Sequence, residues 1–146
     1  VIWLRYRYRY KQQEKKTMKK KIFFISPVQT ATPENFTACG KYVEKLEKEG
    51  CKVHWHIRAT DQNDPIGINI CDANLRKIRE ADEIHIWYLK ESSGIHFDIG
   101  AVYMLTRILG FKKKIVFVNK NDFADDIGEH KGKSFARVLD FLDKNT

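Results

Sequence analysis

Short apolar runs alternate with stretches of helical periodicity from residue 22 to the end of the chain. Runs rich in β-branched and aromatic residues predict buried strands at 22–25, 51–57, 83–89 and 115–118. Apolar residues at helical spacing predict helices at 32–50, 70–81, 96–110 and 134–142. The acidic segment 121–129 leaves room for a fifth, short edge strand. This alternation is typical of an α/β domain.

Right-handed crossovers leave few arrangements for such a chain. We expect a doubly wound, flavodoxin-like parallel sheet of four to five strands in the order 2-1-3-4-5, with helices on both faces. Ligands of these sheets bind beyond the carboxyl ends of the strands, where the strand order reverses. Here that point falls between the first and third strands, so the loops at 26–32 and 90–94 are the candidate binding loops.

Local signals predict the ends and faces of three helices. Thr32 is placed to cap the first helix, whose first position is Pro33. The third helix is expected to open near His96 and to close at Gly110. The expected core-facing residues are Phe97, Ala101, Val102, Leu105 and Leu109 in the third helix, and Phe135, Val138, Leu139 and Leu142 in the last.

Positive charge is concentrated at the start of the chain. The 146 residues carry a formal net charge of +8. Residues 1–21 hold nine Lys or Arg and one acid, Glu14, whereas residues 22–146 hold 18 basic and 18 acidic side chains. We therefore expect a basic, disordered or appended tail at 1–21 and the folded domain at 22–146.

The tail alternates Arg and Tyr over residues 5–10. One interpretation is an arm for RNA or a membrane surface, because Arg and aromatic rings suit stacking and phosphate contact. The other is a disordered extension, or translated sequence upstream of a start at Met18. Nucleic-acid binding is expected only through this tail. No membrane span is expected, because no apolar run approaches the roughly 18 residues that one needs.

The cysteines and histidines argue against a metal site. Cys39, Cys51 and Cys71 are odd in number, widely spaced and without a CxxC pair, which indicates free thiols in a reducing, cytoplasmic compartment. His54 and His56 alternate on the second strand, which allows either a metal pair or two solvent-facing histidines. Because no third ligand follows at suitable spacing, we expect solvent-facing histidines, no metal and no cofactor.

The loop after the third strand has the composition of an anion site. Ser92, Ser93 and Gly94 come just before a helix, whose first N–H groups and dipole favour a phosphate. Asp98 is expected in the first turn of that helix, where the dipole would keep it ionised, as a carboxylate nucleophile requires. The structural alternative is that Ser92 or Ser93 caps the helix and Asp98 complements its dipole.

The stretch Asn74 to Asp82, the strand after it and the stretch Ser92 to Ala101 resemble the nucleoside 2-deoxyribosyltransferase family and its 2'-deoxynucleoside 5'-phosphate N-hydrolase relatives. Members read approximately D-x-x-x-I-x-x-A-D, a strand, then S/D-x-G-x-x-x-E-[LI]-G-x-A. The likeness covers residues 22–118 and includes the Ser-Pro turn after the first strand. It implies a homodimer or larger assembly, in which a neighbour completes each pocket.

The resemblance also implies roles for individual residues. Asp98 occupies the place of the catalytic glutamate, which attacks the anomeric carbon and releases the base. Ser92 stands where transferases have an aspartate and monophosphate hydrolases a serine, and a hydroxyl can donate to a phosphate that a carboxylate would repel. Ser26, Pro27 and Gln29 fall in the loop that, in the family, wraps the base and sugar.

Two departures from the family pattern keep a second hypothesis open. Asp98 is one methylene shorter than glutamate, and Asn74 stands where the family has an aspartate. An amide can form hydrogen bonds but cannot accept a proton as a carboxylate does. Either the pocket is rebuilt around a shifted substrate, or the chain binds nucleotides without cleaving them.

Two further side chains have a functional and a structural interpretation. His96 is a candidate proton donor to the leaving base, because an imidazole titrates near neutrality, or else a partly exposed residue of the first turn. Arg58 follows the second strand and either reaches a phosphate or is a solvated loop residue.

The sequence thus predicts cleavage of the N-glycosidic bond of a (deoxy)nucleoside 5'-monophosphate through a carboxylate nucleophile, by hydrolysis or base exchange. The alternative is a catalytically altered nucleotide-binding or sensing module.

Overall fold

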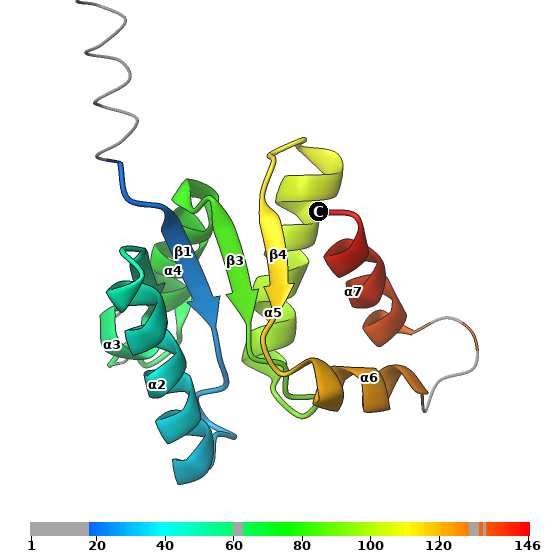
Figure 1. Ribbon diagram of the computed structural model, residues 1–146, viewed down its shortest axis with the longest axis horizontal. Helices are drawn as coiled ribbons and strands as arrows, with labels where there is room; N and C mark the ends of the chain where they lie inside the picture. The colour runs from blue at the N-terminus through cyan, green and yellow to red at the C-terminus, as the bar shows by residue number, and fades with distance from the viewer. Residues whose placement is uncertain (1–17, 60–62, 129–131, 133) are drawn as a thin grey trace, which may run out of the picture.

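The computed structural model describes residues 18–59, 63–128, 132 and 134–146. Its strands are β1 (Lys21–Ile25), β2 (Lys52–Trp55), β3 (Glu83–Ile86) and β4 (Lys114–Phe117). They form one parallel sheet in the order β2-β1-β3-β4 (Figure 1). The predicted doubly wound α/β order is confirmed for these four strands.

The described chain starts just ahead of β1. Met18 to Lys20 are exposed and belong to no helix or strand. β1 begins at Lys21, whose N–H donates to Oδ2 of Asp82 at 2.8 Å and so joins the start of β1 to the start of β3. Residues 1–17 of the predicted tail lie outside the described residues. In the described part, no helix is long and apolar enough to cross a membrane.

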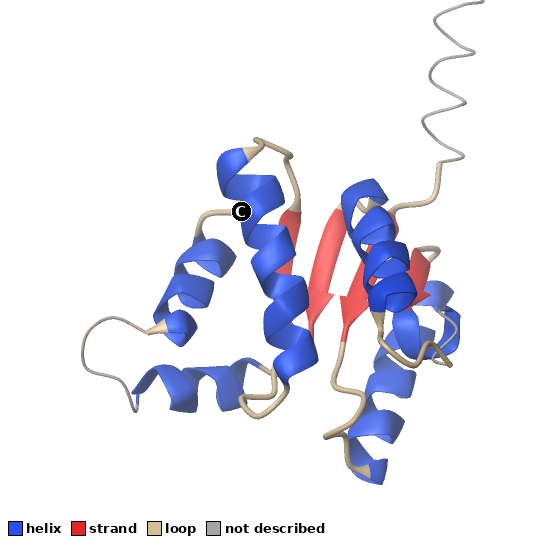
Figure 2. Ribbon diagram, turned by 180° about the vertical axis from the view of Figure 1, so that it is seen from behind, coloured by secondary structure: helices blue, strands red, loops and turns tan. Residues whose placement is uncertain are grey.

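Helices cover both faces of the sheet. α2 (Pro33–Lys48) packs on one face, and α4 (Ile68–Glu80), α5 (Ser93–Tyr103) and α7 (Phe135–Lys144) pack on the other. Figure 2, seen from behind, turns this second face toward the viewer. Successive residues of a strand point to opposite faces. Ile22 and Phe24 therefore pack with α2, whereas Phe23 and Ile25 pack with α4, α5 and α7.

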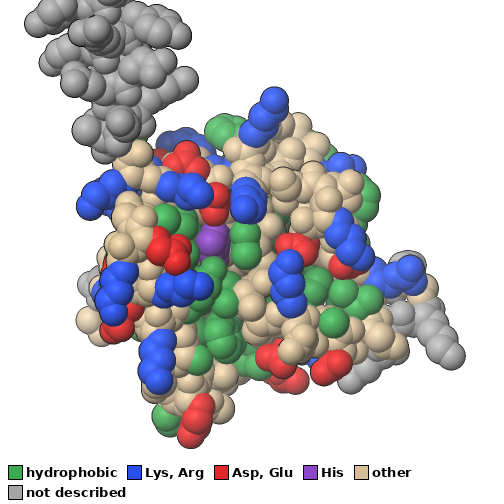
Figure 3. Space-filling view, in the orientation of Figure 1, with side chains coloured by type: hydrophobic (Ala, Val, Ile, Leu, Met, Phe, Trp, Pro, Cys, Tyr) green, Lys and Arg blue, Asp and Glu red, His purple; other side chains and the backbone are tan. Residues whose placement is uncertain are grey.

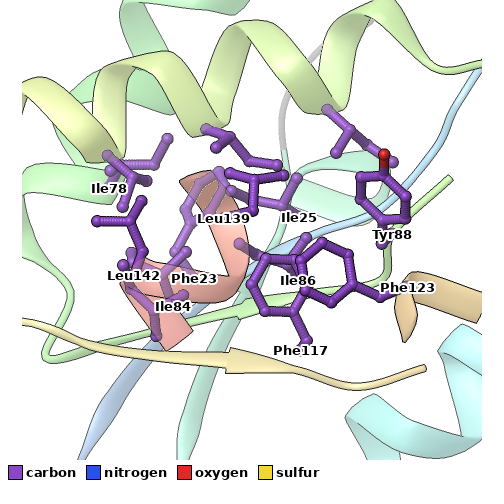
Figure 4. Packing of buried hydrophobic residues seen from close by; sticks show 14 of the residues in the cluster. Phe23, Ile25, Ile78, Ile84, Ile86, Tyr88, Phe117, Phe123, Leu139 and Leu142 are labelled. Carbon is purple, nitrogen blue, oxygen red and sulfur yellow. The ribbon is translucent and has the colours of Figure 1, made fainter. Parts of the chain in front are cut away.

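The larger apolar cluster lies beneath α4, α5 and α7 (Figure 4). Phe117 of β4 stacks on Phe123, with ring centroids 4.2 Å apart and planes 5° apart. Leu139 and Leu142 close the cluster from α7. On the opposite face, no helix of the described chain crosses in front of β3 and β4, and hydrophobic side chains are visible at the centre of that surface (Figures 1 and 3).

The predicted start of α2 is confirmed in detail. The Thr32 hydroxyl accepts from Asn35 N at 3.1 Å, and Asn35 Oδ1 accepts from Thr32 N at 3.0 Å. Pro33 takes the first position of α2, where its missing N–H has no helical acceptor to lose. The cap fixes where the loop after β1 ends.

Two segments differ from the predicted strands. The segment expected to hold a fifth strand forms α6 (Lys120–Gly128) instead. Its Asn, Asp, Ala and Gly residues are weak strand formers, and Asp122 in the first turn stabilises a helix start. The second strand ends at Trp55, and the chain turns at once into the short helix α3 (His56–Ala59).

The third predicted helix differs in its start and in its buried face. α5 begins at Ser93 and continues into a π-helical turn, Met104–Ile108. Phe97 and Leu109, expected in the core, are 57 % and 60 % exposed. Because α5 is apolar almost all round, periodicity does not select its buried face. In α7, likewise, Leu139 and Leu142 are buried but Phe135 is 80 % exposed.

Candidate functional site

The loop after β3 leads into a capped helix start. Ser92 is the N-cap of α5, and its buried hydroxyl accepts from Ile95 N at 3.4 Å. Ser93 and Gly94, which follow it, are exposed. The first turn of a helix offers N–H groups without intrahelical acceptors. The start of α5 can therefore receive an anion from solvent.

Asp98 is a buried carboxyl on this helix. It is 8 % exposed and lies on the buried side of α5 with Ile95 and Val102. Burial raises its pKa from 3.8 to about 7. This corrects the expectation that the helix dipole keeps Asp98 ionised. Asp98 is the sixth residue of α5, beyond the first turn in which the dipole acts, so desolvation dominates.

Helix α4 lies beside Asp98 and carries a buried polar residue on the same side. The pKa of the Cys71 thiol is raised first by burial and next by the charge of Asp98, which places this part of α4 beside Asp98. Asn74 is three residues after Cys71, hence on the same side of α4, and is buried. The structure thus brings Asn74 and Asp98 to neighbouring parts of two packed helices.

The loop after β1 reaches the same edge of the sheet. Trp87 N donates to Ile25 O at 2.8 Å and so joins the ends of β1 and β3, which lead into the two predicted binding loops. The Ser26 hydroxyl is buried and accepts from Trp55 Nε1 at 2.8 Å. Pro27 is fully buried, and Gln29 is exposed. Ser26 and Pro27 are therefore part of the packed carboxyl edge of the sheet. Gln29 is exposed, so its side chain can contact a ligand.

His96 faces away from Asp98. Residues two apart do not share a helix face. The His96 Nδ1–H donates to the Ser92 carbonyl at 2.6 Å, and the ring lies edge-on to Tyr88 with centroids 5.7 Å apart. His96 lines an apolar cavity of about 400 Å³ between α5 and α7, together with Tyr103. The structure does not bring His96 to the Asp98 carboxyl as a proton donor.

Arg58 is engaged elsewhere. Its guanidinium donates to both carboxylate oxygens of Glu47, at 2.6 and 3.3 Å, and to Val53 O at 3.2 Å. It follows β2, the outer strand, which β1 separates from β3 and from the start of α5. Arg58 therefore holds α3 to α2 and is not brought to the Ser92 loop.

The two histidines of the second strand are not solvent-facing, contrary to expectation. His54 is partly buried and stacks on Phe23 with centroids 5.2 Å apart. His56 is 4 % exposed, and burial lowers its pKa from 6.5 to about 4. His56 begins α3, and its ring stacks on Phe23 with centroids 6.4 Å apart. Among the described residues, no group of three or more His, Cys, Asp or Glu is placed to hold a metal ion.

Sequence reasoning missed a polar network beside this site. Asn119, just after β4, accepts from Tyr88 N at 2.7 Å and donates to Tyr88 O at 2.6 Å. The Tyr88 hydroxyl donates to the buried carboxylate of Asp126, which Lys90 also approaches at 3.3 Å. An Asn directly after a buried strand is the one signal that points to it. The network fixes the loop that leads to Ser92.

The chain is similar in structure to known proteins but matches no family model. No curated protein matches it either. The 2-desoxiribosyltransferase from Leishmania mexicana is similar in structure at 22 % sequence identity and a TM-score of 0.47. The similarity covers 67 % of this chain and 64 % of that protein, so less than two thirds of that protein's length is spanned.

Proposed function

We propose that this chain cleaves the N-glycosidic bond of a (deoxy)nucleoside 5'-monophosphate, by hydrolysis or base exchange, with Asp98 as the nucleophile. The observation that carries the proposal is the buried Asp98 carboxyl on the helix that opens at the Ser92 loop, at the point where the strand order reverses. The resemblance of residues 74–101 to deoxyribosyltransferases supports a nucleoside or nucleotide as substrate.

The reaction has two displacement steps. A carboxylate oxygen of Asp98 attacks the anomeric carbon, and the bond to the base breaks with its electron pair leaving on the base, which takes a proton. Water, or a second base, then attacks the same carbon and releases the Asp98 carboxylate. The two-step route replaces one difficult displacement by two easier ones.

The start of α5 is the place we assign to the 5'-phosphate. Exposed Ser93 and Gly94 present the first N–H groups of the helix, and the positive end of the helix dipole favours a phosphate there. Ser92 can turn its hydroxyl from the capping bond toward the phosphate as a donor. Gln29, exposed on the loop after β1, is assigned to the base or sugar.

Protonation of Asp98 sets the working pH. With a pKa of about 7, the carboxyl is mostly protonated at pH 6 and mostly ionised at pH 8. Only the carboxylate has an electron pair ready for attack. The rate of base release therefore rises with pH through about 7. Asn74, an amide, can position the sugar or base by hydrogen bonds without itself titrating in this range.

The test is release of free base from deoxynucleoside 5'-monophosphates, separated by chromatography. Wild-type protein should release base, and Asp98→Asn should lower the rate at least about a thousandfold, because it removes the nucleophile. Asp72→Asn, at an exposed acid on α4, is the matched control and should keep the wild-type rate. Equal release by wild type and Asp98→Asn would remove Asp98 from the mechanism.

A nucleotide-binding or sensing module is the second candidate function. The observations that favour it are Asn74 in place of a carboxylate and the limited access to Asp98. Calorimetry with a deoxynucleoside monophosphate separates the two. Binding without base release after prolonged incubation supports the module, whereas base release supports the enzyme.

The assembly state and the cellular location remain part of the proposal. The resemblance implies a homodimer or larger assembly, and light scattering after size-exclusion chromatography measures it directly. A cytoplasmic location is expected from the free thiols Cys39, Cys51 and Cys71.

A further inference from the structure

The outer side of α5 is apolar although it faces solvent. Phe97, Met104 and Ile108 are 57 %, 50 % and 66 % exposed. With Gly100 and Ala101 between them, they recur every three or four residues along α5 and the π-helical turn. We call these five residues the outer stripe. Figure 2 shows α5 in front of the sheet, with no helix or strand of the described chain in front of it.

Charged side chains are missing from this side of α5. From Ser92 to Thr106 the sequence contains one Asp, Glu, Lys or Arg, which is the buried Asp98. The solvent face of a helix in a globular protein normally carries charged and polar residues, and a helix that is apolar all round is normally covered. The outer stripe is therefore a surface to which a partner is expected to bind.

Gly100, at the middle of the outer stripe, is not required by the packing of its own chain. Its φ is not positive, so the backbone accepts any residue there. A Cβ built on Gly100 meets no described atom within 4 Å beyond its own stretch of helix. Glycine inside a helix lowers stability relative to alanine. The open space over Gly100 is what a closely packed second helix would fill.

The apolar surface continues from α5 onto α7. Gly100 and Tyr103 line the cavity of about 400 Å³ together with Phe135 and Val138 of α7. Phe135, Val138 and Phe141 are exposed, as are the three large residues of the outer stripe. At about half of ~200 Å² each, these six side chains expose roughly 600 Å². A standard dimer buries about 800 Å² per partner, of which somewhat more than half is apolar, so this surface is large enough.

We propose that a second copy of this chain binds the outer stripe, with the two α5 helices antiparallel about a twofold axis between Gly100 and Ala101. The axis places Gly100 opposite Ala101 of the second copy, and Phe97 opposite Met104 of the second copy. A twofold interface joins the same patch of both copies and so needs a self-complementary surface. The outer stripe is self-complementary, because Phe97 lies three residues before Gly100 and Met104 lies three residues after Ala101. Asp98 is on the buried side of α5, so the proposal does not rest on its reaction.

Sedimentation equilibrium of the full chain at 150 mM NaCl measures the dissociation constant of the dimer. Wild type should sediment with twice the mass of one chain. Met104→Glu should raise the dissociation constant at least about a hundredfold, because symmetry buries two uncompensated carboxylates in each dimer. Thr37→Glu adds the same charge at an exposed residue of α2, on the other face of the sheet, and should leave the constant unchanged.

Gly100→Leu is a second variant should Met104→Glu lose its far-UV circular dichroism. The leucine side chain enters open space in its own chain but holds the two helices apart, so it should weaken the dimer at least about tenfold. A wild-type protein that sediments as a monomer at 100 μM would overturn the proposal. Dissociation constants equal to that of wild type in Met104→Glu and Gly100→Leu would overturn it as well.

Two cysteine variants test the register of the helices. Phe97→Cys chains and Met104→Cys chains, mixed to exchange subunits and oxidised, should form a disulfide between the two kinds of chain. In either variant alone, the two new thiols are seven residues apart along the helices, about 10 Å, which a disulfide does not span. Peptide mass spectrometry separates this disulfide from those of the native cysteines. Cross-links that form as readily in one variant alone as in the mixture would overturn the proposed register.

Discussion

Asp98 and Lys113 are buried ionisable side chains at opposite edges of the same sheet, and the protein treats them differently. Lys113, at the amino edge, donates two short hydrogen bonds to the carbonyls that end α4. Asp98, toward the carboxyl edge, accepts no hydrogen bond and pairs with no cation among the described residues, and its pKa is raised by burial. The protein binds the Lys113 ammonium group, whereas it offers the Asp98 carboxyl no partner among the described residues.

The difference separates a structural role from a functional one. A buried polar group that is satisfied contributes to stability, whereas an unsatisfied one costs stability and persists only where something else requires it. Lys113 therefore belongs to the scaffold. Asp98 is the group that a substrate, rather than the fold, is expected to use.

The largest expected effect is on catalysis. Asp98→Asn should lower the rate of base release at least about a thousandfold, and Lys113→Met should leave the rate per folded molecule within a few-fold of wild type. Chromatography of the free base measures both rates. If both variants lost a similar share of the rate, Asp98 would be needed only for folding, and its role would not differ from that of Lys113.

Asp98→Asn should also stabilise the folded protein at high pH. Between pH 3.8 and about 7, folded Asp98 holds a proton that the unfolded chain has released, so its contribution to stability falls as pH rises. Raising the pKa this far costs up to about 4 kcal/mol at pH 8, which Asn avoids. Urea unfolding at pH 4.5 and 8 should show a gain for Asp98→Asn that grows with pH. A gain independent of pH would contradict the raised pKa.

His56 should show the opposite pH dependence. Its folded pKa of about 4 lies below the unfolded value of 6.5, so the unfolded chain gains a proton first as pH falls. The resulting loss of stability reaches about 3 kcal/mol by pH 4. His56→Leu removes this pH-dependent loss. The free energy of unfolding of the variant, compared with that of wild type, should therefore increase from pH 7 to pH 4. A constant difference would mean that His56 is charged in the folded protein.

Lys113→Met should give the smallest effect. The change leaves the carbonyls of Arg79 and Ala81 without their donor, which costs about 2 kcal/mol of unfolding free energy. Lys112→Met, at the exposed neighbouring residue, is the control and should change stability by less than about 0.5 kcal/mol. Denaturant midpoints for the two variants provide the measurement, and equal midpoints would contradict the satisfied role of Lys113.

The fold could be predicted because its signals are local and repeated. Four apolar runs and the Thr32-Pro33 cap define strands and a helix start directly. The buried face of α5 could not be predicted, because this helix is apolar almost all round and its orientation depends on packing against α4 and α7. The fifth strand was predicted wrongly for a similar reason. Segment 120–128 forms α6, and Phe123 packs this helix into a core cluster whose members are distant in sequence.

The sequence predicted which loops lie at the candidate site, but only partly which way its side chains point. Spacing placed Ser92 just before a helix, and Ser92 is its N-cap, but Asp98 lies beyond the first turn in which it was predicted. The direction of Arg58 depends on Glu47, which lies in another helix. His96 is held by the Ser92 carbonyl, four residues earlier, and the helical pattern alone does not show this bond. The raised pKa of Asp98 depends on burial, which only the packed structure supplies.

The most direct test of the central claim is a search for the glycosyl–Asp98 ester itself. Protein incubated briefly with a deoxynucleoside 5'-monophosphate at pH 8 is quenched in acid and digested, and its peptides are analysed by mass spectrometry. The account predicts a deoxyribose phosphate adduct on the peptide that contains Asp98, absent from Asp98→Asn. Release of base with no adduct on that peptide, and at the same rate in Asp98→Asn, would contradict it.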